Sequence, residues 1–283
     1  MILGVDVGGT YLRYELRKGS KSVKKATLKS SEIGLATFLD SLLKKEQSIT
    51  SIYISYAGQV RDGRIITAPN ITIDKENIQA YIEEKYEVEL LIENDLNCAV
   101  LAESQAYDTQ NIAALFVGSG LGLGIISDSV LLRGFENIAT ELGHIPFQDA
   151  PFFCSCGKRN CMELYASGSG VLKWKQYYKL DESFSLQALC KNKRKDAQKI
   201  YRQFIEALLY AVGTTITLFN SEILVLGGGI IKNNPDIYKE ISRRIKNYAM
   251  PLSLQNMKIV CSQFENSSLE GAFLLKEKRC QIS

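Results

Sequence analysis

Histidine, tryptophan and proline are scarce in this sequence, and long apolar runs are absent. The 283 residues include one histidine, one tryptophan and five prolines. Because no stretch reaches the ~18 consecutive apolar residues of a membrane-spanning helix, we expect no membrane span. The chain opens on the apolar run 1–5, without a basic segment followed by an apolar core, so we expect no secretory signal peptide. These features favour a cytoplasmic protein.

Neither sign of charge predominates. The chain has 34 lysines and arginines against 31 aspartates and glutamates, for a net charge of +3. A protein with this balance lacks the extended positive field that attracts a phosphate backbone, so nucleic acid is not an expected partner. Hydrophobic residues make up 46% of the chain, which is enough for the core of one large domain or two smaller ones.

The seven cysteines do not have the pattern of a disulfide framework, because their number is odd and most of them are scattered. The scattered ones are Cys98, Cys190, Cys261 and Cys280. The others, Cys154, Cys156 and Cys161, lie close together, and the only histidine, His144, lies shortly before them. One imidazole and three thiolates suit tetrahedral zinc, and four protein ligands make such a metal structural. The alternative is three buried thiols with an unrelated histidine.

Apolar, β-branched runs and helical patterns succeed one another, which predicts an α/β protein. The predicted strands are 2–7, 51–56, 89–92, 112–117, 123–126 and 222–226. The predicted helices are 33–45, 75–85, 98–106, 170–178, 197–218, 235–248 and 269–278. The polar stretch 107–111 precedes a second round of strands, so we predict a first domain over 1–108 and a second over 109–266.

The segment Asp6-Val7-Gly8-Gly9-Thr10 directly follows the first predicted strand. Two glycines allow a turn to approach a bound group closely and leave backbone N–H groups facing an anion. Thr10 adds a hydroxyl donor, and Asp6 can hold a hydrated Mg²⁺. A plain β-hairpin turn fits a Gly-Gly pair equally well, so this motif alone leaves both interpretations open.

Two further glycine-rich segments follow predicted strands. The segment 118–124 has four glycines in seven residues, which indicates backbone held close to a ligand, with a tight hairpin as the alternative. Gly227-Gly228-Gly229 stands between a strand and a helix, as at many nucleotide contacts and at many structural turns.

Glu93-Asn94-Asp95 lies where a predicted strand meets a predicted helix. Aspartate is among the preferred N-cap residues, so capping is the default interpretation of Asp95. A carboxylate at a strand end is also well placed to be a general base.

Together and in this order, these segments resemble the ROK family of repressors, open reading frames and sugar kinases. The likeness runs from Asp6 to Glu270-Gly271-Ala272, and the Cys/His segment is its most specific part. The resemblance implies an actin-like ATPase (hexokinase/RNase H-like) fold of two α/β domains with a structural zinc site. It also implies a C-terminal helix, 267–283, that returns to the first domain.

The resemblance assigns roles to individual residues. Nucleotide contacts fall to Asp6, Gly8, Gly9, Thr10, Gly118, Ser119, Gly120, Gly122, Gly227 and Gly228. Sugar contacts fall to Asn70, Asn94, Glu141, His144 and Glu163. Asp95 matches the catalytic base, and the zinc ligands are His144, Cys154, Cys156 and Cys161. His144 would bind zinc through one ring nitrogen and sugar through the other.

A few positions depart from the family pattern. Tyr11 stands where a lysine is common, and Asn160 stands where a glycine usually precedes the third cysteine. Asparagine tolerates the left-handed backbone conformation, so we expect the turn at Asn160 to be retained.

The implied activity is transfer of the γ-phosphate of Mg-ATP to a sugar hydroxyl, the 6-hydroxyl of glucose or of a related aldohexose or N-acetylhexosamine. The expected cofactors are ATP, Mg²⁺ and structural Zn²⁺, and the expected assembly is a homodimer. Repressors of the family carry a helix-turn-helix domain before the D-x-G-G-T segment, which starts here at residue 6. A non-catalytic sugar-sensing regulator is the other alternative, and the presence of Asp95 and both phosphate loops argues against it.

Overall fold

The computed structural model of the protein describes residues 1–68 and 71–278. Asn70, one of the predicted sugar contacts, lies outside the described residues. The chain forms two compact units. The first contains Met1–Asp108, Ser129–Ala139 and the described residues from Phe264 onward, and the second contains Thr109–Asp128 and Thr140–Gln263.

The sheet of the first unit has the strand order β3-β2-β1-β4-β7. Its strands are β1 (Ile2–Val7), β2 (Tyr11–Lys18), β3 (Lys21–Lys29), β4 (Ser51–Tyr56) and β7 (Glu89–Asn94). β1 pairs antiparallel with β2 and parallel with β4, and β4 pairs parallel with β7. Every residue of β4 is buried because helices cover both faces of the central strands.

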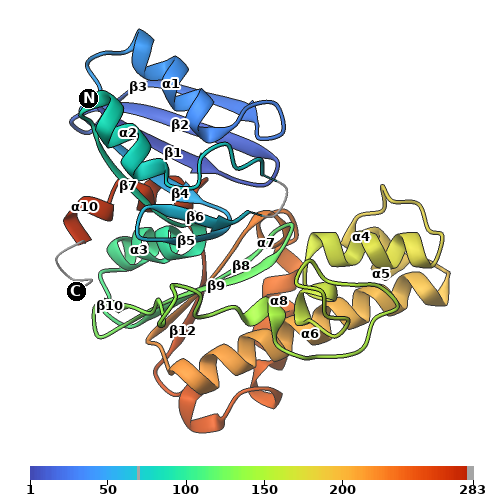
Figure 1. Ribbon diagram of the computed structural model, residues 1–283. Helices are drawn as coiled ribbons and strands as arrows, with labels where there is room; N and C mark the ends of the chain where they lie inside the picture. The colour runs from blue at the N-terminus through green and yellow to red at the C-terminus, as the bar shows by residue number, and fades with distance from the viewer. Residues whose placement is uncertain (69–70, 279–283) are drawn as a thin grey trace. The chain divides into compact units, whose positions relative to one another are not determined.

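Helices line both faces of this sheet (Figure 1). α1 (Leu35–Lys45) and α2 (Ile78–Tyr86) lie along one face, and α3 (Asp95–Tyr107) and α9 (Ser267–Ala272) lie along the other. A side chain at Gly271 of α9 would collide with the backbone of α3 at Cys98, so this glycine permits the close packing of the two helices. The short helix α10 (Leu275–Lys278) follows α9.

Two smaller features complete the first unit. β5 (Gln59–Arg61) and β6 (Arg64–Thr67) form an antiparallel hairpin of their own. The segment Ser129–Ala139 begins with the two-residue strand β10 (Val130–Leu131) and belongs to this unit, whereas the sequence placed it within 109–266.

The second unit has a sheet in which β9, β8, β11 and β12 follow one another in that order. These strands are β8 (Ile112–Val117), β9 (Leu121–Ser127), β11 (Ile223–Gly227) and β12 (Lys258–Cys261). β8 pairs antiparallel with β9 and parallel with β11, which pairs parallel with β12. Both units therefore contain a hairpin followed by two parallel crossover strands.

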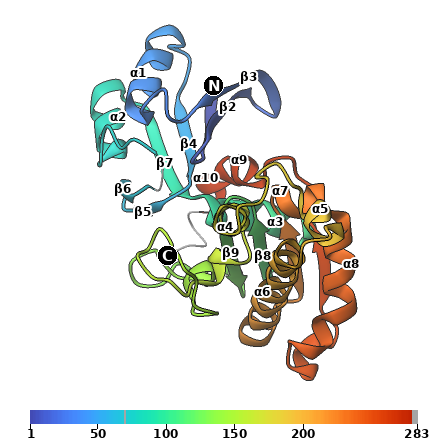
Figure 2. The same ribbon diagram turned by 90° about the vertical axis from the view of Figure 1, so that its right-hand side faces the viewer.

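Figure 2 shows α6 and α8 on the same side of this sheet. The helices of the unit are α4 (Gly168–Tyr177), α5 (Leu186–Lys191), α6 (Lys195–Phe219), α7 (Gly229–Asn233) and α8 (Pro235–Arg244). Short 3-10 turns lie at Leu142–His144, Met162–Leu164, Ile245–Asn247 and Pro251–Leu254. In α6, Ile200, Phe204 and Leu208 are buried at four-residue spacing, so one face of this helix joins the core.

Among the described residues, we find no helix that combines the length and the apolar character needed to cross a bilayer.

Candidate active site and metal centre

The first glycine motif closes the hairpin between β1 and β2. The Gly8 N–H donates to the Tyr11 carbonyl at 2.9 Å, and the Gly8 carbonyl accepts from Ser30 Oγ at 2.6 Å. Gly9 and Thr10 are exposed at the tip. The hairpin interpretation is therefore correct for the backbone, and the exposed tip is also compatible with an approaching phosphate.

Asp6 is buried where β1 meets this turn, with 7% of its surface exposed. Its carboxylate accepts from Ser55 Oγ at 2.9 Å and Asn266 Nδ2 at 2.8 Å, and Arg13 Nη1 lies 3.5 Å away. Burial raises the pKa of Asp6, and these three partners only partly offset that effect. A bound Mg²⁺ would favour the charged form, so the residue fits a cation-binding role.

The second glycine motif closes the hairpin between β8 and β9. The Gly118 N–H donates to the Gly120 carbonyl at 3.0 Å. The first residues of α4 then hold the turn, because the N–H groups of Gly168 and Ser169 donate to the carbonyls of residues 118 and 119. Gly122 is part of β9, opposite Phe116, and does not belong to the turn.

Glu163 connects this turn to the Cys/His segment. Its Oε2 accepts from the Leu121 N–H at 3.1 Å. A Cβ at Gly120 would lie 2.6 Å from the same oxygen, so a larger residue there would force the carboxylate to move. The other oxygen, Oε1, lies 3.7 Å from Cys154 Sγ.

The third glycine motif has a packing explanation. Gly228 has a φ of 87°, and a Cβ there would lie 2.5 Å from the Val117 carbonyl oxygen. A Cβ at Gly227 would lie 2.5 Å from the ring of Phe116. Both glycines let the chain pass against β8, as the structural-turn interpretation requires.

The N-cap of α3 is Asn94, so the default interpretation of Asp95 as the cap is wrong. Asn94 Oδ1 accepts from the N–H groups of Leu96 at 2.9 Å and Asn97 at 3.2 Å. Asn94 Nδ2 donates to the Gly58 carbonyl at 3.0 Å, which leaves one amide N–H of Asn94 for another partner. Asp95 is the first residue of the helix and is half-buried.

The predicted zinc ligands converge. The ligand atoms of His144, Cys154, Cys156 and Cys161 all lie within 4.8 Å of one another. His144 Nδ1 lies 3.5 Å from Cys154 Sγ, and Cys156 Sγ lies 3.3 Å from Cys161 Sγ. Tetrahedral ligands about 2.0–2.3 Å from a metal lie roughly 3.3–3.8 Å apart, so these residues fit zinc.

The turn that carries the cysteines differs from expectation at one residue. Gly157 has the left-handed conformation, with a φ of 86°. Asn160 has no positive φ, and its carbonyl accepts from the Phe147 N–H at 2.7 Å. Asparagine therefore needs no left-handed conformation before the third cysteine.

The predicted sugar contacts of the second unit lie beside the metal ligands. His144 Nε2 faces Glu141 Oε2 at 3.8 Å, while Nδ1 faces the cysteines. Partial burial raises the pKa of Glu141, the neighbouring Glu163 adds to this, and His144 opposes it. Two carboxylates and an imidazole nitrogen thus form a polar cluster suited to several hydroxyl groups.

The predicted site residues that the structure describes are divided between the two units. Asp6, the turn after it, Asn94 and Asp95 belong to the first, and all the others belong to the second. The sequence analysis did not single out two polar residues beside the site, Asn266 and Glu93. Asn266 reaches Asp6 from a distant part of the chain, which no local pattern indicates. The sequence did indicate that Glu93 has polar partners, because a carboxylate in a buried strand requires them.

The duplicated α/β architecture, its two glycine hairpins and the polar cluster define a protein with the actin-like ATPase fold. The model of the ROK family matches residues 2–279. The chain therefore belongs to the ROK family.

Named relatives include sugar kinases. The glucokinase of Thermotoga maritima is 26% identical over 312 residues, which cover 98% of each chain. The N-acetyl-D-glucosamine kinase of Vibrio vulnificus is 25% identical over 303 residues, which cover 98% of this chain and all of the relative. A ROK family transcriptional regulator, a homologue of the Escherichia coli MLC protein, has a similar solved structure. Its TM-score is 0.81 at 23% identity, over 98% of this chain and 78% of the regulator.

Proposed function

We propose that the protein is a hexose kinase that transfers the γ-phosphate of ATP to a sugar hydroxyl. The observation that carries this proposal is the position of Asp95 where β7 ends and α3 begins. There, Asn94 occupies the N-cap position, and the half-buried Asp95 is the first residue of the helix, with Oδ1 accepting from the Leu96 N–H at 3.0 Å. The kinase names of the full-length relatives support the same activity.

In this proposal Asp95 is the general base. The sugar hydroxyl oxygen attacks the γ-phosphorus, the bond from phosphorus to the ADP oxygen breaks, and the hydroxyl proton passes to the Asp95 carboxylate. The exposed backbone at Gly9 and Ser119 would face the phosphates, with Thr10 as a hydroxyl donor. Mg²⁺, when bound near Asp6, would neutralise charge on the phosphates.

The sugar would be held by the remaining amide N–H of Asn94 and by Glu141, His144 and Glu163. We infer that the acceptor is the 6-hydroxyl of glucose or of a related aldohexose or N-acetylhexosamine, as the names of the relatives suggest. Zinc bound at the Cys/His cluster would be structural. His144 and Glu163 border both the cluster and the sugar contacts, so the metal would fix their positions.

The test is an ADP-release assay with a panel of hexoses and N-acetylhexosamines, with the products identified by mass. We expect one or a few sugars to gain a single phosphate, with turnover dependent on Mg²⁺. ADP release that no sugar stimulates, with no phosphorylated product, would contradict the proposal.

A non-catalytic sugar-sensing regulator of the same family is the second candidate, and the likeness to a ROK transcriptional regulator favours considering it. Calorimetry separates the two candidates. A sensor would bind a hexose without turning over ATP, whereas the kinase would do both.

A further inference from the structure

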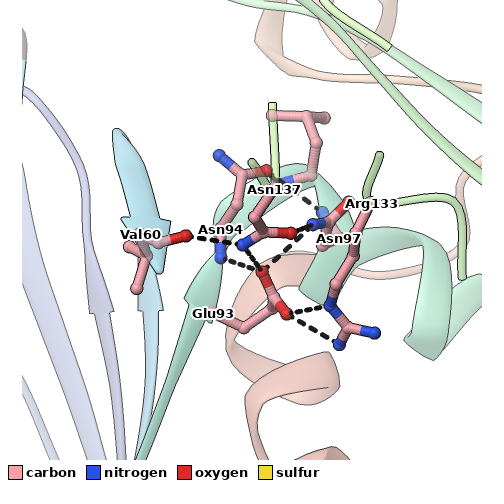
Figure 3. Close-up of polar contacts among 7 residues, drawn as sticks. Val60, Glu93, Asn94, Asn97, Arg133 and Asn137 are labelled. Atoms are coloured by element: carbon pink, nitrogen blue, oxygen red, sulfur yellow. Dashed lines mark hydrogen bonds and ion pairs between the residues drawn. The ribbon is translucent and has the colours of Figure 1, made fainter. Parts of the chain in front are cut away.

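Glu93, a buried carboxylate without a role in the proposed chemistry, lies two residues before Asp95. It is the penultimate residue of strand β7, and 6% of its surface is exposed. Five donor atoms from four residues surround its two oxygens (Figure 3). This number of partners is high for one side chain, and it calls for an explanation beyond the packing of a strand end.

The two oxygens of Glu93 have different partners. Oε1 accepts from the Asn94 N–H at 2.8 Å and from the side-chain amides of Asn97 and Asn137, each at 3.0 Å. Oε2 accepts from Arg133, with Nε at 2.8 Å and Nη2 at 2.7 Å. The carboxylate is therefore bound by amides on one side and by a guanidinium on the other, as Figure 3 shows.

These partners come from three separate parts of the first unit. Asn97 is on α3, while Arg133 and Asn137 belong to Ser129–Ala139. Asn137 also donates to the Val60 carbonyl on β5 at 2.6 Å, and its φ of 58° is one that asparagine tolerates. Glu93 thus joins the start of α3, the hairpin strand β5 and the segment 129–139 at one point.

Only an ionised carboxylate satisfies all these donors, because it presents acceptors alone. A glutamine at position 93 has nearly the same shape, but its NH₂ group would face either the guanidinium of Arg133 or the amides. Donors would then oppose donors in a buried place. The Glu93→Gln substitution therefore tests the network without creating a cavity.

The network holds the residues on both sides of Asp95. Glu93 binds the N–H of Asn94 and the side chain of Asn97, and the Asn97 N–H binds Asn94 Oδ1. We propose that Glu93 is a positioning residue, which with Arg133 and Asn137 fixes the first turn of α3 so that the Asp95 carboxylate has its reactive orientation. This inference rests on the proposed function of Asp95.

The kinetic test compares Glu93→Gln with Glu136→Gln. Displacement of a catalytic group by about 1 Å costs on the order of 10²-fold in rate, so we expect kcat of Glu93→Gln to fall by about 10–100-fold. The KM for ATP should change little. Glu136 is the matched control, because it is a carboxylate of the same segment, paired with Arg61 of β5, but 43% exposed. Glu136→Gln should retain parental kcat.

Two substitutions of Arg133, one of them conservative, provide a second kinetic test. Arg133→Met leaves the Glu93 charge without its cation, whereas Arg133→Lys retains one charged donor. We expect Arg133→Lys to recover much of the kcat that Arg133→Met loses. Equal kcat in parent, Glu93→Gln and Arg133→Met would overturn the inference, even if the variants melt at lower temperature, because Glu93 would then serve stability alone.

Hydrogen–deuterium exchange separates this inference from the proposed function, since it needs no turnover. Glu93→Gln should accelerate exchange of the amides of residues 94–97 and 133–137 together, while Glu136→Gln should leave 94–97 unchanged. Unchanged exchange at 94–97 in Glu93→Gln would overturn the inference, whether or not the parent phosphorylates a sugar. Failure of the parent to phosphorylate any sugar would instead reject the proposed function.

Discussion

At the scale of single residues, two buried carboxylates of the first unit, Asp6 and Glu93, have different polar partners. Asp6 is buried with three polar partners, and its pKa is nevertheless raised. Glu93 is equally buried, but its partners include the close, two-point contact with Arg133. Asp6 is thus the carboxylate that a cation such as Mg²⁺ would stabilise most directly.

The raised pKa of Asp6 leads to a stability prediction. The folded protein favours the protonated carboxyl, so the stabilising contribution of Asp6 is fully present below pH 3.8, the ordinary pKa. It is lost as the pH rises through the folded-state value. The melting temperature of the parent should therefore fall relative to that of Asp6→Asn as the pH increases from about 4. A difference that does not vary with pH would contradict this. Mg-nucleotide should restore stability to the parent only.

At the scale of elements, two glycines of the turn between β8 and β9 differ in the space around them. A Cβ at Gly118 meets nothing within 4 Å, whereas one at Gly120 lies 2.6 Å from Glu163 Oε2. We expect Gly120→Ala to lower the free energy of unfolding by about 1–3 kcal/mol, because the crowded carboxylate must leave the Leu121 N–H. Gly118→Ala should remain close to the parent in chemical denaturation.

A double-mutant cycle checks the cause of that loss. In a Glu163→Ala background the obstruction is gone, so Gly120→Ala should cost much less there than in the parent. Equal costs in the two backgrounds would show that the Gly120 backbone, and not Glu163, sets the limit.

The Cys/His cluster should act as a structural metal element. We expect about one zinc per chain, and we expect chelation to lower both the melting temperature and the sugar affinity. Cys156→Ser should have both effects, because the cluster adjoins His144 and Glu163. Cys190→Ser, at an exposed cysteine away from the cluster, is the matched control and should behave like the parent. Full stability and sugar affinity in metal-free protein would refute this role.

At the scale of the whole molecule, the sequence predicted the central strands most accurately. The predicted strands 2–7, 51–56 and 112–117 match β1, β4 and β8 at both ends. These strands lie inside their sheets and are rich in apolar and β-branched residues, which sequence reasoning detects readily. The family and its sugar kinase relationship were also predicted, because the glycine and Cys/His motifs are local in the sequence.

Several strands with charged or exposed residues were missed. Nearly all of β3 is exposed and rich in lysine, which protects an edge strand from pairing but hides it from an apolar pattern. β2 contains charged residues, and β12 is short and only half-buried. The predicted helix 269–278 is divided into α9 and α10 at residues 273–274.

The polar contacts of the site could not be predicted because they join distant residues. The partners of Glu93 include Arg133 and Asn137, some 40 positions away, and Asp6 is bound by Asn266. Such pairs follow from the fold and not from spacing. That Asn94 and not Asp95 is the N-cap of α3 also needed the structure, because aspartate and asparagine cap helices about equally well.

The most direct test of the account is kcat for phosphoryl transfer by Asp95→Asn beside the parent. Asn94 holds the first turn of α3, so the variant should keep its melting temperature and its ATP affinity. An amide cannot accept the hydroxyl proton, and loss of a general base typically costs about 10²–10⁴ in rate. The account predicts a fall of that size in a folded, ATP-binding protein. Near-parental kcat in Asp95→Asn would contradict it.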